Sequence, residues 1–478
     1  MSRSTGRFLI IDYNLSRVDD VRHMSAYARE RHGTDVTLIR ADPGAVDAEI
    51  CDEVIDLDPL SPDFVETALR LLGPRRAEFR AGVVFSDNAV QSGAVLLERL
   101  GLRIDSAELA GGAFCKHEYR LSEAAHRKLL AAQRLLVPDF VTVDSRDGLA
   151  AFARSHPEGF VVKPTKEGNN RGVVVVRPGD SLDAAFAEVG PYLEGGVICE
   201  ELLPYRREYS FDGLGQVSFV TEKVSATGRY PVEVAQILPA RLNHAERSAV
   251  ERAGRQVNWL VGQVDGPFHN EIRLSDDAGG TAVVEPNRRP AGMKIWSLAR
   301  WVYGIDFYHR WVDAAFGLTA GSALPEPLCS AATVMLGVRT DRSFAPADVV
   351  PGAAPFEAAV AATAAAHGLL PHELAVKEFG WLSQDRRELH AVARDNADFA
   401  AQGCVVLTAA GADMGEIVRT LREAWSDALD ASSGRGPGAL EPSGAGSRVQ
   451  ESPSAASRAP EPPAPAPLDP FTMMEAAR

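Results

Sequence analysis

The stretch that decides the fold runs from Pro267 to Met293 and reads PFHNEIRLSDDAGGTAVVEPNRRPAGM. Apolar and charged residues alternate on both sides of a segment rich in Asp and Gly, which is the pattern of a β-hairpin. Pairing Ser275 with Thr281 leaves a five-residue loop, a common hairpin length. That register predicts that Glu271 lies directly opposite Glu285.

The predicted hairpin has one charged face and one apolar face. The register places His269 opposite Asn287 and puts Arg273 on the face of the two glutamates. The apolar face is formed by Ile272, Leu274, Ala282 and Val284. Opposed carboxylates repel each other, and a hard divalent cation removes the repulsion. The oxygens of Glu271, Glu285 and Asn287 therefore favour a Mg²⁺ or Mn²⁺ site over the plainer alternative of a solvated hairpin.

Length and composition restrict the class of protein. The 478 residues, 45% of them hydrophobic, suffice for about two to four domains. A formal net charge of −15 argues against a nucleic-acid partner, since such binding needs clustered Lys and Arg. The five cysteines have no CxxC spacing, which fits a reducing compartment. With no secretory signal pattern and no membrane-length apolar run, we expect a cytoplasmic protein without a membrane partner.

The N-terminal part alternates short apolar strands with helical stretches, as an open parallel sheet does. The strand-like runs lie at residues 7–12, 35–40, 53–56 and 82–85. We expect a Rossmann-like domain over residues 1–112. The first run is followed by DYNLSR, without the glycines of a dinucleotide fingerprint, so the sequence does not predict NAD.

The middle of the chain contains a second hairpin pattern with a lysine. The strand FVVKP contains Lys163 and is followed by TKEGNNRG, which contains Gly168 and Gly172, and by a strand at residues 173–176. A glycine-containing loop beside a lysine can fold over a triphosphate, because its backbone N–H groups approach the phosphate oxygens closely. The alternative is a solvated hairpin with one exposed lysine.

Several further elements are expected along the chain. Helical stretches are predicted at residues 116–136, 243–261 and 297–316, and strands at residues 196–203 and 217–222. The strand containing VICEELL breaks into a linker, whose backbone groups suit an adenine ring. Residues 318–430 predict a small α+β lobe. Residues 431–478 are rich in Pro, Ser, Ala and Gly and predict a disordered tail.

Taken in order, these features resemble the ATP-grasp carboxylate–amine ligases over residues 1 to about 430. The chain is most similar to the L-amino-acid ligases, which make dipeptides, and shares its nucleotide loop with D-alanine–D-alanine ligases. The resemblance implies a mixed α/β and α+β chain with the ATP-grasp fold. Its expected parts are a Rossmann-like pre-domain (1–112), a nucleotide-binding subdomain (113–196), a metal- and substrate-binding subdomain (197–317), a C-terminal α+β lobe (318–430) and the disordered tail (431–478).

The resemblance also implies a nucleotide site. Lys116 in CKHEYR and Lys163 match the phosphate-binding lysines, although Cys115 stands where Asp or Asn is usual. Gly168 lies in the loop that closes over the phosphates. Glu200 is expected to take the adenine amino group. The remaining nucleotide contacts are the hinge backbone around Glu201 and Leu202, and Glu208, which is expected to hold the ribose.

The metal and substrate positions follow in the same way. The metal positions of the family correspond to Glu271, Glu285 and Asn287. Arg289 matches the arginine that stabilises the transferred phosphoryl group, and Gly292 matches the glycine that the substrate approaches. Arg273 is expected to support the metal carboxylates or to bind a substrate carboxylate. The general base is left open between His269 and Glu233, and His269 is equally suited to support Asn287.

The implied reaction is the ATP-dependent joining of a carboxylate to an amine through an acyl phosphate, with release of ADP and phosphate. The expected substrates are small molecules, namely amino acids, and the expected product is a dipeptide or similar amide. ATP and Mg²⁺ or Mn²⁺ are the expected cofactors, and a homodimer is common among such proteins. One alternative is a ligase with a carrier-protein or larger biosynthetic acceptor. Another is an inactive nucleotide-binding regulator, which the presence of the full residue set disfavours.

Overall fold

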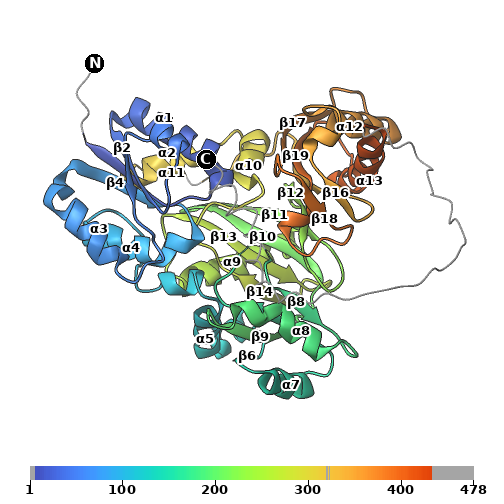
Figure 1. The fold of residues 1–478 in the computed structure, drawn as a ribbon, viewed down its shortest axis with the longest axis horizontal. Coiled ribbons are helices and arrows are strands. Elements are labelled where there is room, and N and C mark those ends of the chain that lie inside the picture. Colours follow the sequence, from blue (N-terminus) through green and yellow to red (C-terminus); the bar gives the residue numbers. More distant parts are fainter. Residues whose placement is uncertain (1–5, 169, 319–320, 322, 433–478) are drawn as a thin grey trace, which may run out of the picture.

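The computed structural model describes residues 6–168, 170–318, 321 and 323–432 (Figure 1). Within this part of the chain, no helix is long and apolar enough to cross a membrane. Helix α13 (Met414–Ser432) includes Ala431 and Ser432, so the prediction that disorder starts at residue 431 is wrong for these two residues. The rest of the predicted tail, 433–478, lies outside the described residues.

The pre-domain is built on a four-stranded parallel sheet in the order β3-β2-β1-β4. Its elements are β1 (Arg7–Ile11), α1 (Val18–His32), β2 (Asp35–Arg40), α2 (Ala45–Ile50), β3 (Glu53–Asp56), α3 (Phe64–Leu72), β4 (Phe79–Val84) and α4 (Val90–Arg99). Phe8 and Ile10 pack towards α1, whereas Leu9 and Ile11 pack towards α3 and α4, so the central strand is apolar on both faces. The predicted Rossmann-like layout is confirmed.

A smaller antiparallel sheet carries the glycine-containing loop and has the order β6-β9-β7-β8. Its strands are β6 (Phe140–Thr142), β7 (Phe160–Pro164), β8 (Val174–Val176) and β9 (Val197–Glu201), with helices α7 (Arg146–Ser155) and α8 (Leu182–Val189) packed on it. Because β9 pairs with both β6 and β7, the expected boundary between residues 196 and 197 falls one strand too early.

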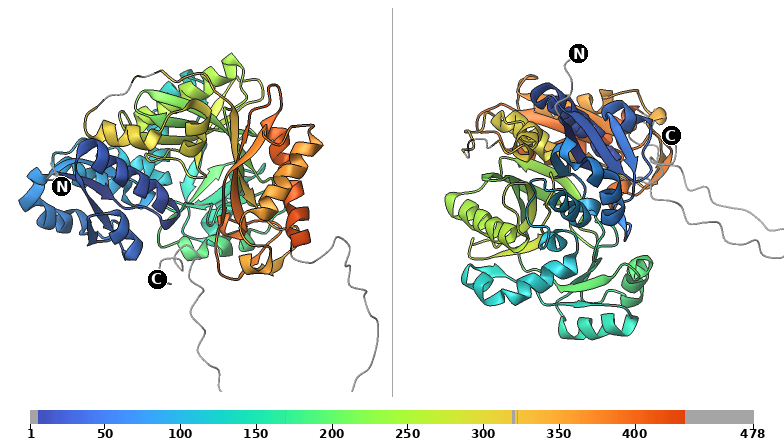
Figure 2. Two further views of the ribbon diagram at one scale, coloured as in Figure 1. Left: turned by 90° about the horizontal axis from the view of Figure 1, so that it is seen from above. Right: turned by 90° about the vertical axis from the view of Figure 1, so that its left-hand side faces the viewer.

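The central sheet has nine strands in the order β17-β19-β15-β12-β11-β10-β13-β14-β5. They are β5 (Leu135–Leu136), β10 (Arg207–Leu214), β11 (Val217–Ser225), β12 (Glu233–Leu238), β13 (Pro267–Leu274), β14 (Thr281–Glu285), β15 (Ser330–Leu336), β17 (Leu374–Trp381) and β19 (Ala401–Leu407). Strand β12 pairs with β15, so the expected C-terminal lobe continues this sheet instead of forming a sheet of its own. Figure 2 shows the pre-domain and the C-terminal strands on opposite sides of the central strands.

Several helices cover the central sheet. Helix α9 (His244–Leu260) packs on β10, β13 and β14, and the C-terminal strands are covered by α12 (Ala354–Ala366) and α13. The small ribbon β16 (Arg342–Phe344) and β18 (Arg387–Leu389) completes the C-terminal part. This arrangement leaves the hairpin β13–β14 between the pre-domain and the small sheet, as Figure 1 shows.

Each of two predicted helical stretches consists of more than one element. Residues 116–136 form α5 (Lys116–Ala125), α6 (Arg127–Ala132) and then β5, which pairs with β14. Residues 297–316 form most of α10 (Ile295–Tyr303) and all of α11 (Phe307–Ala315), separated by Gly304 at φ 67°. Helix α11 packs on α1 and β4 of the pre-domain while its Phe307 still contacts Phe219 on β11, so the break has a packing reason.

The turn of the β13–β14 hairpin differs from the prediction. Thr281 pairs with Leu274 instead of Ser275, so the predicted pairing of Ser275 with Thr281 is wrong. Ser275 closes the loop in another way: its backbone N–H donates to the Gly280 oxygen at 3.0 Å, and its Oγ accepts from the Gly280 N–H at 2.9 Å. These local hydrogen bonds shift the ladder by one residue at the turn.

A β-bulge compensates for this shift. Ile272 pairs with Val283, but the next pair along the ladder is Glu271 with Glu285, which leaves Val284 as an extra residue in β14. The predicted opposition of Glu271 and Glu285 is therefore confirmed. The shift at the turn also changes the apolar face, because Val283 takes the buried position beside Ile272 that was predicted for Val284.

The contact of α9 with β10 predicts the effect of a single methyl group. A Cβ at Gly254 would lie 2.2 Å from Cδ1 and 2.6 Å from Cβ of Phe211. We expect Gly254→Ala to lower the free energy of unfolding by about 1–3 kcal/mol, although alanine is the better helix former. Urea denaturation measures the change. Gly415→Ala in α13, where the nearest atom is the Asp413 carboxylate at 3.3 Å, is the matched control and should be close to neutral. Equal effects of the two substitutions would contradict the packing argument.

Candidate active site

The two opposed carboxylates each pair with a lysine from another element. Glu271 Oε2 lies 2.7 Å from Nζ of Lys223 on β11, and Glu285 Oε2 lies 3.0 Å from Nζ of Lys116 at the start of α5. The repulsion between the glutamates is thus offset by two ammonium groups. The sequence predicts Lys116 as a phosphate-binding lysine but gives no signal for Lys223, because the predicted strand ends at Glu222, one residue before it.

Lys223 also holds Glu233, one of the two candidate bases. Its Nζ lies 2.6 Å from Glu233 Oε1, and Gln236 Nε2 donates to Glu233 Oε2 at 3.2 Å. Burial by itself would lower the pKa of Lys223, but the carboxylates of Glu233 and Glu271 raise it well above its ordinary value. Lys223 is therefore a fixed positive charge between two acidic side chains.

The amide of Asn287 is oriented by hydrogen bonds on both sides. Its Nδ2 donates to the His269 carbonyl at 3.1 Å, and its Oδ1 accepts from Arg289 Nη2 at 3.3 Å. The backbone N–H of His269 donates to the Asn287 carbonyl at 2.9 Å, which places these residues opposite each other as predicted. The Asn287 amide oxygen and the carboxylates of Glu271 and Glu285 form a donor set that fits a hard divalent cation.

His269 lies between two carboxylates. Its Nδ1 is 2.7 Å from Asp212 Oδ1, and its Nε2 is 3.5 Å from Glu271 Oε1. Asp212 also accepts hydrogen bonds from Ser210 and Thr221. Burial would lower the pKa of His269, but Asp212 and Glu271 raise it to about 9. In this arrangement His269 is a cation at neutral pH that supports Glu271, and both ring nitrogens face acceptors.

Glu200 is surrounded by cationic groups. Arg120 Nε and Nη2 donate to its two carboxylate oxygens, each at 3.0 Å, and Lys163 Nζ lies 2.9 Å from Oε2. Burial would raise the pKa of Glu200, but Arg120 and Lys163 lower it to about 2. Burial also lowers the pKa of Lys163 despite the neighbouring carboxylate. A carboxylate offers about four acceptor sites, so the expected adenine contact of Glu200 competes with three existing bonds.

The loop after β7 is tied to Lys116. Lys116 Nζ donates to the Glu167 carbonyl at 2.7 Å, and its backbone N–H donates to the Thr165 carbonyl at 2.8 Å. No atom outside its chain neighbours lies within 4 Å of a Cβ placed at Gly168, whereas Gly172 has φ 67° and such a Cβ would lie 2.7 Å from the Tyr192 ring. The loop geometry therefore requires glycine at position 172 and leaves Gly168 conformationally unconstrained.

Arg273 pairs with a different glutamate from those predicted. Its guanidinium donates to Glu208 Oε1, the residue opposite it on β10, and Ser225 Oγ donates to Glu208 Oε2. Arg273 thus supports the expected ribose ligand, and the structure does not place it on the metal carboxylates. Nearby, the backbone N–H of Glu201 donates to the Asp139 carbonyl at 2.8 Å, and Leu202 follows directly after β9.

Arg289 connects the hairpin to the pre-domain. Its Nε donates to Asp87 Oδ1 at 2.6 Å, just beyond the carboxyl end of β4. Arg17 Nη1 donates to the Ala291 carbonyl at 3.0 Å and so holds the following loop from the pre-domain side. Open space surrounds the position where a Cβ would stand at Gly292. Ligands of open α/β sheets bind at strand carboxyl ends, so this is where a substrate is expected to reach Arg289.

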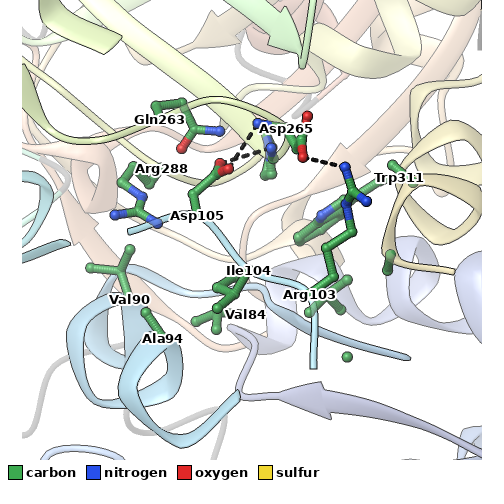
Figure 3. Close-up of a pocket in the computed structure, with 16 residues that line it drawn as sticks. Val84, Val90, Ala94, Arg103, Ile104, Asp105, Gln263, Asp265, Arg288 and Trp311 are labelled. Carbon is green, nitrogen blue, oxygen red and sulfur yellow. Dashed lines mark hydrogen bonds and ion pairs between the residues drawn. The ribbon is translucent and has the colours of Figure 1, made fainter. Parts of the chain in front are cut away.

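The neighbouring Arg288 points into a separate, largely apolar pocket at the junction of the pre-domain and the central sheet (Figure 3). Arg288 Nη1 donates to the carbonyls of Ser106 and Val261 at 2.6 and 3.1 Å. Asp105 accepts the backbone N–H groups of Asp265 and Gly266, each at 2.8 Å. These bonds anchor the linker after the pre-domain. The adjacent arginines therefore have different partners, and it is Arg289 that contacts Asp87 and Asn287.

No family model matches the chain, but comparisons with individual proteins find relatives. D-alanine–D-alanine ligase from Gluconobacter oxydans strain 621H is 31% identical over 283 residues, which are 57% of this chain and 83% of that enzyme. The chain belongs to the ATP-grasp carboxylate–amine ligases. Alanine–anticapsin ligase from Bacillus amyloliquefaciens is 22% identical over 342 residues, and the match spans 65% of this ATP-grasp chain and 66% of that relative.

Solved ATP-grasp structures share the fold. The L-amino acid ligase from Bacillus licheniformis has a TM-score of 0.65 at 16% identity, covering 88% of this chain and 98% of that one. N5-carboxyaminoimidazole synthetase from Staphylococcus aureus with bound ADP has a TM-score of 0.58 at 15% identity, covering 88% and 97%. The predicted fold and the predicted enzyme class, an ADP-forming carbon–nitrogen ligase, are confirmed at the level of the family.

The position of His269 predicts a dependence of stability on pH. A histidine whose pKa is about 6.5 when unfolded and about 9 when folded stabilises the protein fully below pH 6.5, and this contribution is lost as the pH rises through 9. With a chelator present, we expect wild-type protein to lose up to about 3 kcal/mol more stability between pH 6 and 10 than His269→Gln does. Urea titrations at each pH measure it. His390→Gln, at a partly exposed histidine, is the control. A parallel pH dependence in His269→Gln and wild type would contradict the assignment.

Proposed function

We propose that this ATP-grasp chain joins the carboxylate of one amino acid to the amine of another, releasing ADP and phosphate. The observation that carries the proposal is the pair of opposed carboxylates, Glu271 and Glu285, which are neutralised by Lys223 on β11 and by Lys116 beside the loop after β7. Amino-acid substrates are supported by the relatives, which are a D-alanine–D-alanine ligase and an alanine–anticapsin ligase. The amino-acid pair used by this chain is part of the proposal.

We assign a divalent cation to Glu271, Glu285 and Asn287. When bound there, Mg²⁺ or Mn²⁺ would supply positive charge to the phosphate oxygens of ATP. The chain's own cations, Lys116, Lys163 and Arg289, are assigned to the remaining negative charge of the triphosphate. Lys116 suits this role because its Nζ already lies between the loop after β7 and Glu285.

The proposed chemistry has two steps. The substrate carboxylate attacks the γ-phosphorus of ATP and forms an acyl phosphate with loss of ADP, because an unactivated carboxylate has no adequate leaving group. The amine of the second substrate then attacks the acyl carbon and expels phosphate. The loop after β7 would exclude water that otherwise hydrolyses the intermediate. We assign the proton acceptor to Glu233, since both ring nitrogens of His269 face carboxylates.

The substrate carboxylate is assigned to the space beside Arg289 and Gly292. Arg289 lies between the pre-domain carboxylate of Asp87 and the Asn287 amide oxygen, and the backbone at Gly292 is open. A guanidinium in this position suits a carboxylate or a phosphoryl group, because its planar N–H groups match their oxygens. The following residues Met293 and Lys294 both have positive φ, at 45° and 62°, so this loop holds a strained conformation.

The function is tested by measuring ADP and phosphate release over pairs of amino acids, with mass spectrometry of the products. We expect at least one pair to give an amide and one ADP for each amide formed. Hydroxylamine should replace the amine and yield a hydroxamate of the first substrate. ADP release only with a carrier-bound acceptor would move the proposal to that acceptor class. Nucleotide binding without ADP release for any pair would contradict a ligase and favour a regulatory protein.

A substitution at the hairpin tests the metal assignment. Glu285→Gln keeps the size of the side chain but removes one of the two opposed charges, so we expect kcat to fall by at least about 100-fold at fixed Mg²⁺, in line with the loss of a ligand to a catalytic cation. Asp276→Asn, an exposed acid in the same hairpin, is the matched control and should keep wild-type activity. Normal metal-dependent ADP release by Glu285→Gln would show that the cation is held elsewhere.

A further inference from the structure

Arg120 is a fully buried arginine that contacts both halves of the candidate nucleotide site. Its side chain is 1% exposed and lies on α5, one helical turn after Lys116. Because residues four apart on a helix share a face, Lys116 and Arg120 both reach β14. Lys116 contacts the Glu285 carboxylate, whereas Arg120 contacts the backbone just before it.

On the metal side, Arg120 binds the bulge itself. Its Nη2 donates to the carbonyls of Val283 and Val284 at 3.0 and 3.1 Å. The pairing of β5 with β14 extends from Thr281 to Ala282, so Arg120 supplies hydrogen-bond donors to β14 just beyond the end of this strand pairing. A buried carbonyl without a donor is costly, and this guanidinium supplies donors to the carbonyl of the extra residue Val284 and to that of Val283 just before it. The bulge is what sets Glu285 opposite Glu271 in this sequence.

On the nucleotide side, the same guanidinium binds the end of β9. Arg120 Nε and Nη2 hold both oxygens of Glu200 at 3.0 Å, and Nη1 donates to Glu123 Oε2 at 2.5 Å. Glu200 in turn holds Lys163 at 2.9 Å. One side chain therefore joins the small sheet, with its phosphate lysine, to the strand of the central sheet that bears the expected metal ligand.

We propose that Arg120 is a positioning residue that couples nucleotide binding to divalent-cation binding by fixing the β14 bulge and Glu200 relative to each other. The proposal rests on the assignment of nucleotide and cation to this site under the proposed function. Arginine is required because the contacts to Glu200 and to the bulge carbonyls use nitrogens in a fixed planar arrangement. A lysine supplies charge but cannot reproduce that arrangement.

The test compares ADP affinity with and without Mn²⁺ in wild type and Arg120→Lys, by isothermal titration calorimetry. We define the coupling ratio as the dissociation constant of ADP without Mn²⁺ divided by that with saturating Mn²⁺. We expect Arg120→Lys to reduce this ratio by about tenfold or more, because the donors to the bulge are lost. Arg127→Lys, the same substitution at a half-exposed arginine on the next helix, should keep the ratio within about twofold of wild type.

An unchanged coupling ratio in Arg120→Lys, even with a lower melting temperature, would overturn the proposal and leave Arg120 a purely structural residue. A wild-type ratio near one would overturn it as well. If Arg120→Lys does not fold, Glu200→Gln provides the second test. This substitution weakens the contact between Arg120 and Glu200, so it should lower the coupling ratio although Glu285 lies on another sheet. An unchanged coupling ratio in Glu200→Gln overturns the proposal. The coupling ratio is a binding measurement and does not require turnover. Wild-type protein that binds Mn²⁺ and ADP but releases no ADP from ATP would therefore refute the proposed ligase function without refuting the role of Arg120.

Discussion

The structure depends on holding two carboxylates, Glu271 and Glu285, against each other at a largely buried place. Two unit charges about 5 Å apart repel by about 3 kcal/mol at an effective dielectric constant of about 20. The chain offsets this repulsion with Lys223 and Lys116, which come from different elements and lie 2.7 and 3.0 Å from the two acids. The side chains of Lys223, on β11, and Lys116, on α5, therefore both reach the hairpin.

The same constraint explains how the domains contribute to one site. The small sheet provides Lys163 and Glu200, and α5 provides Lys116 and Arg120. The pre-domain contributes Asp87, which accepts a hydrogen bond from Arg289. Each of these charged side chains is paired with an oppositely charged neighbour. A triphosphate and its cation would therefore bind by replacing existing partners in these ion pairs. This exchange is consistent with a site whose lysines are assigned to phosphate.

The sequence predicted the opposition of the two glutamates better than the turn and the bulge of the hairpin that carries them. Alternation alone predicted that Glu271 faces Glu285, and this is confirmed. It placed the turn wrongly, because the hydrogen bonds of Ser275 within the loop compete with the ladder. It also missed the bulge, whose carbonyls accept hydrogen bonds from Arg120, a residue 163 and 164 positions away that looks like one solvated charge among many in CKHEYR. Contacts between distant segments decide such features, and local periodicity does not contain them.

The measurement that tests the central claim most directly is a crystal structure of the protein with ADP and Mn²⁺, in which anomalous scattering locates the manganese. The account predicts a peak bounded by the side chains of Glu271, Glu285 and Asn287, with the ADP phosphates beside Lys116 and Lys163. Manganese bound elsewhere, or ADP phosphates remote from these lysines, would contradict the account.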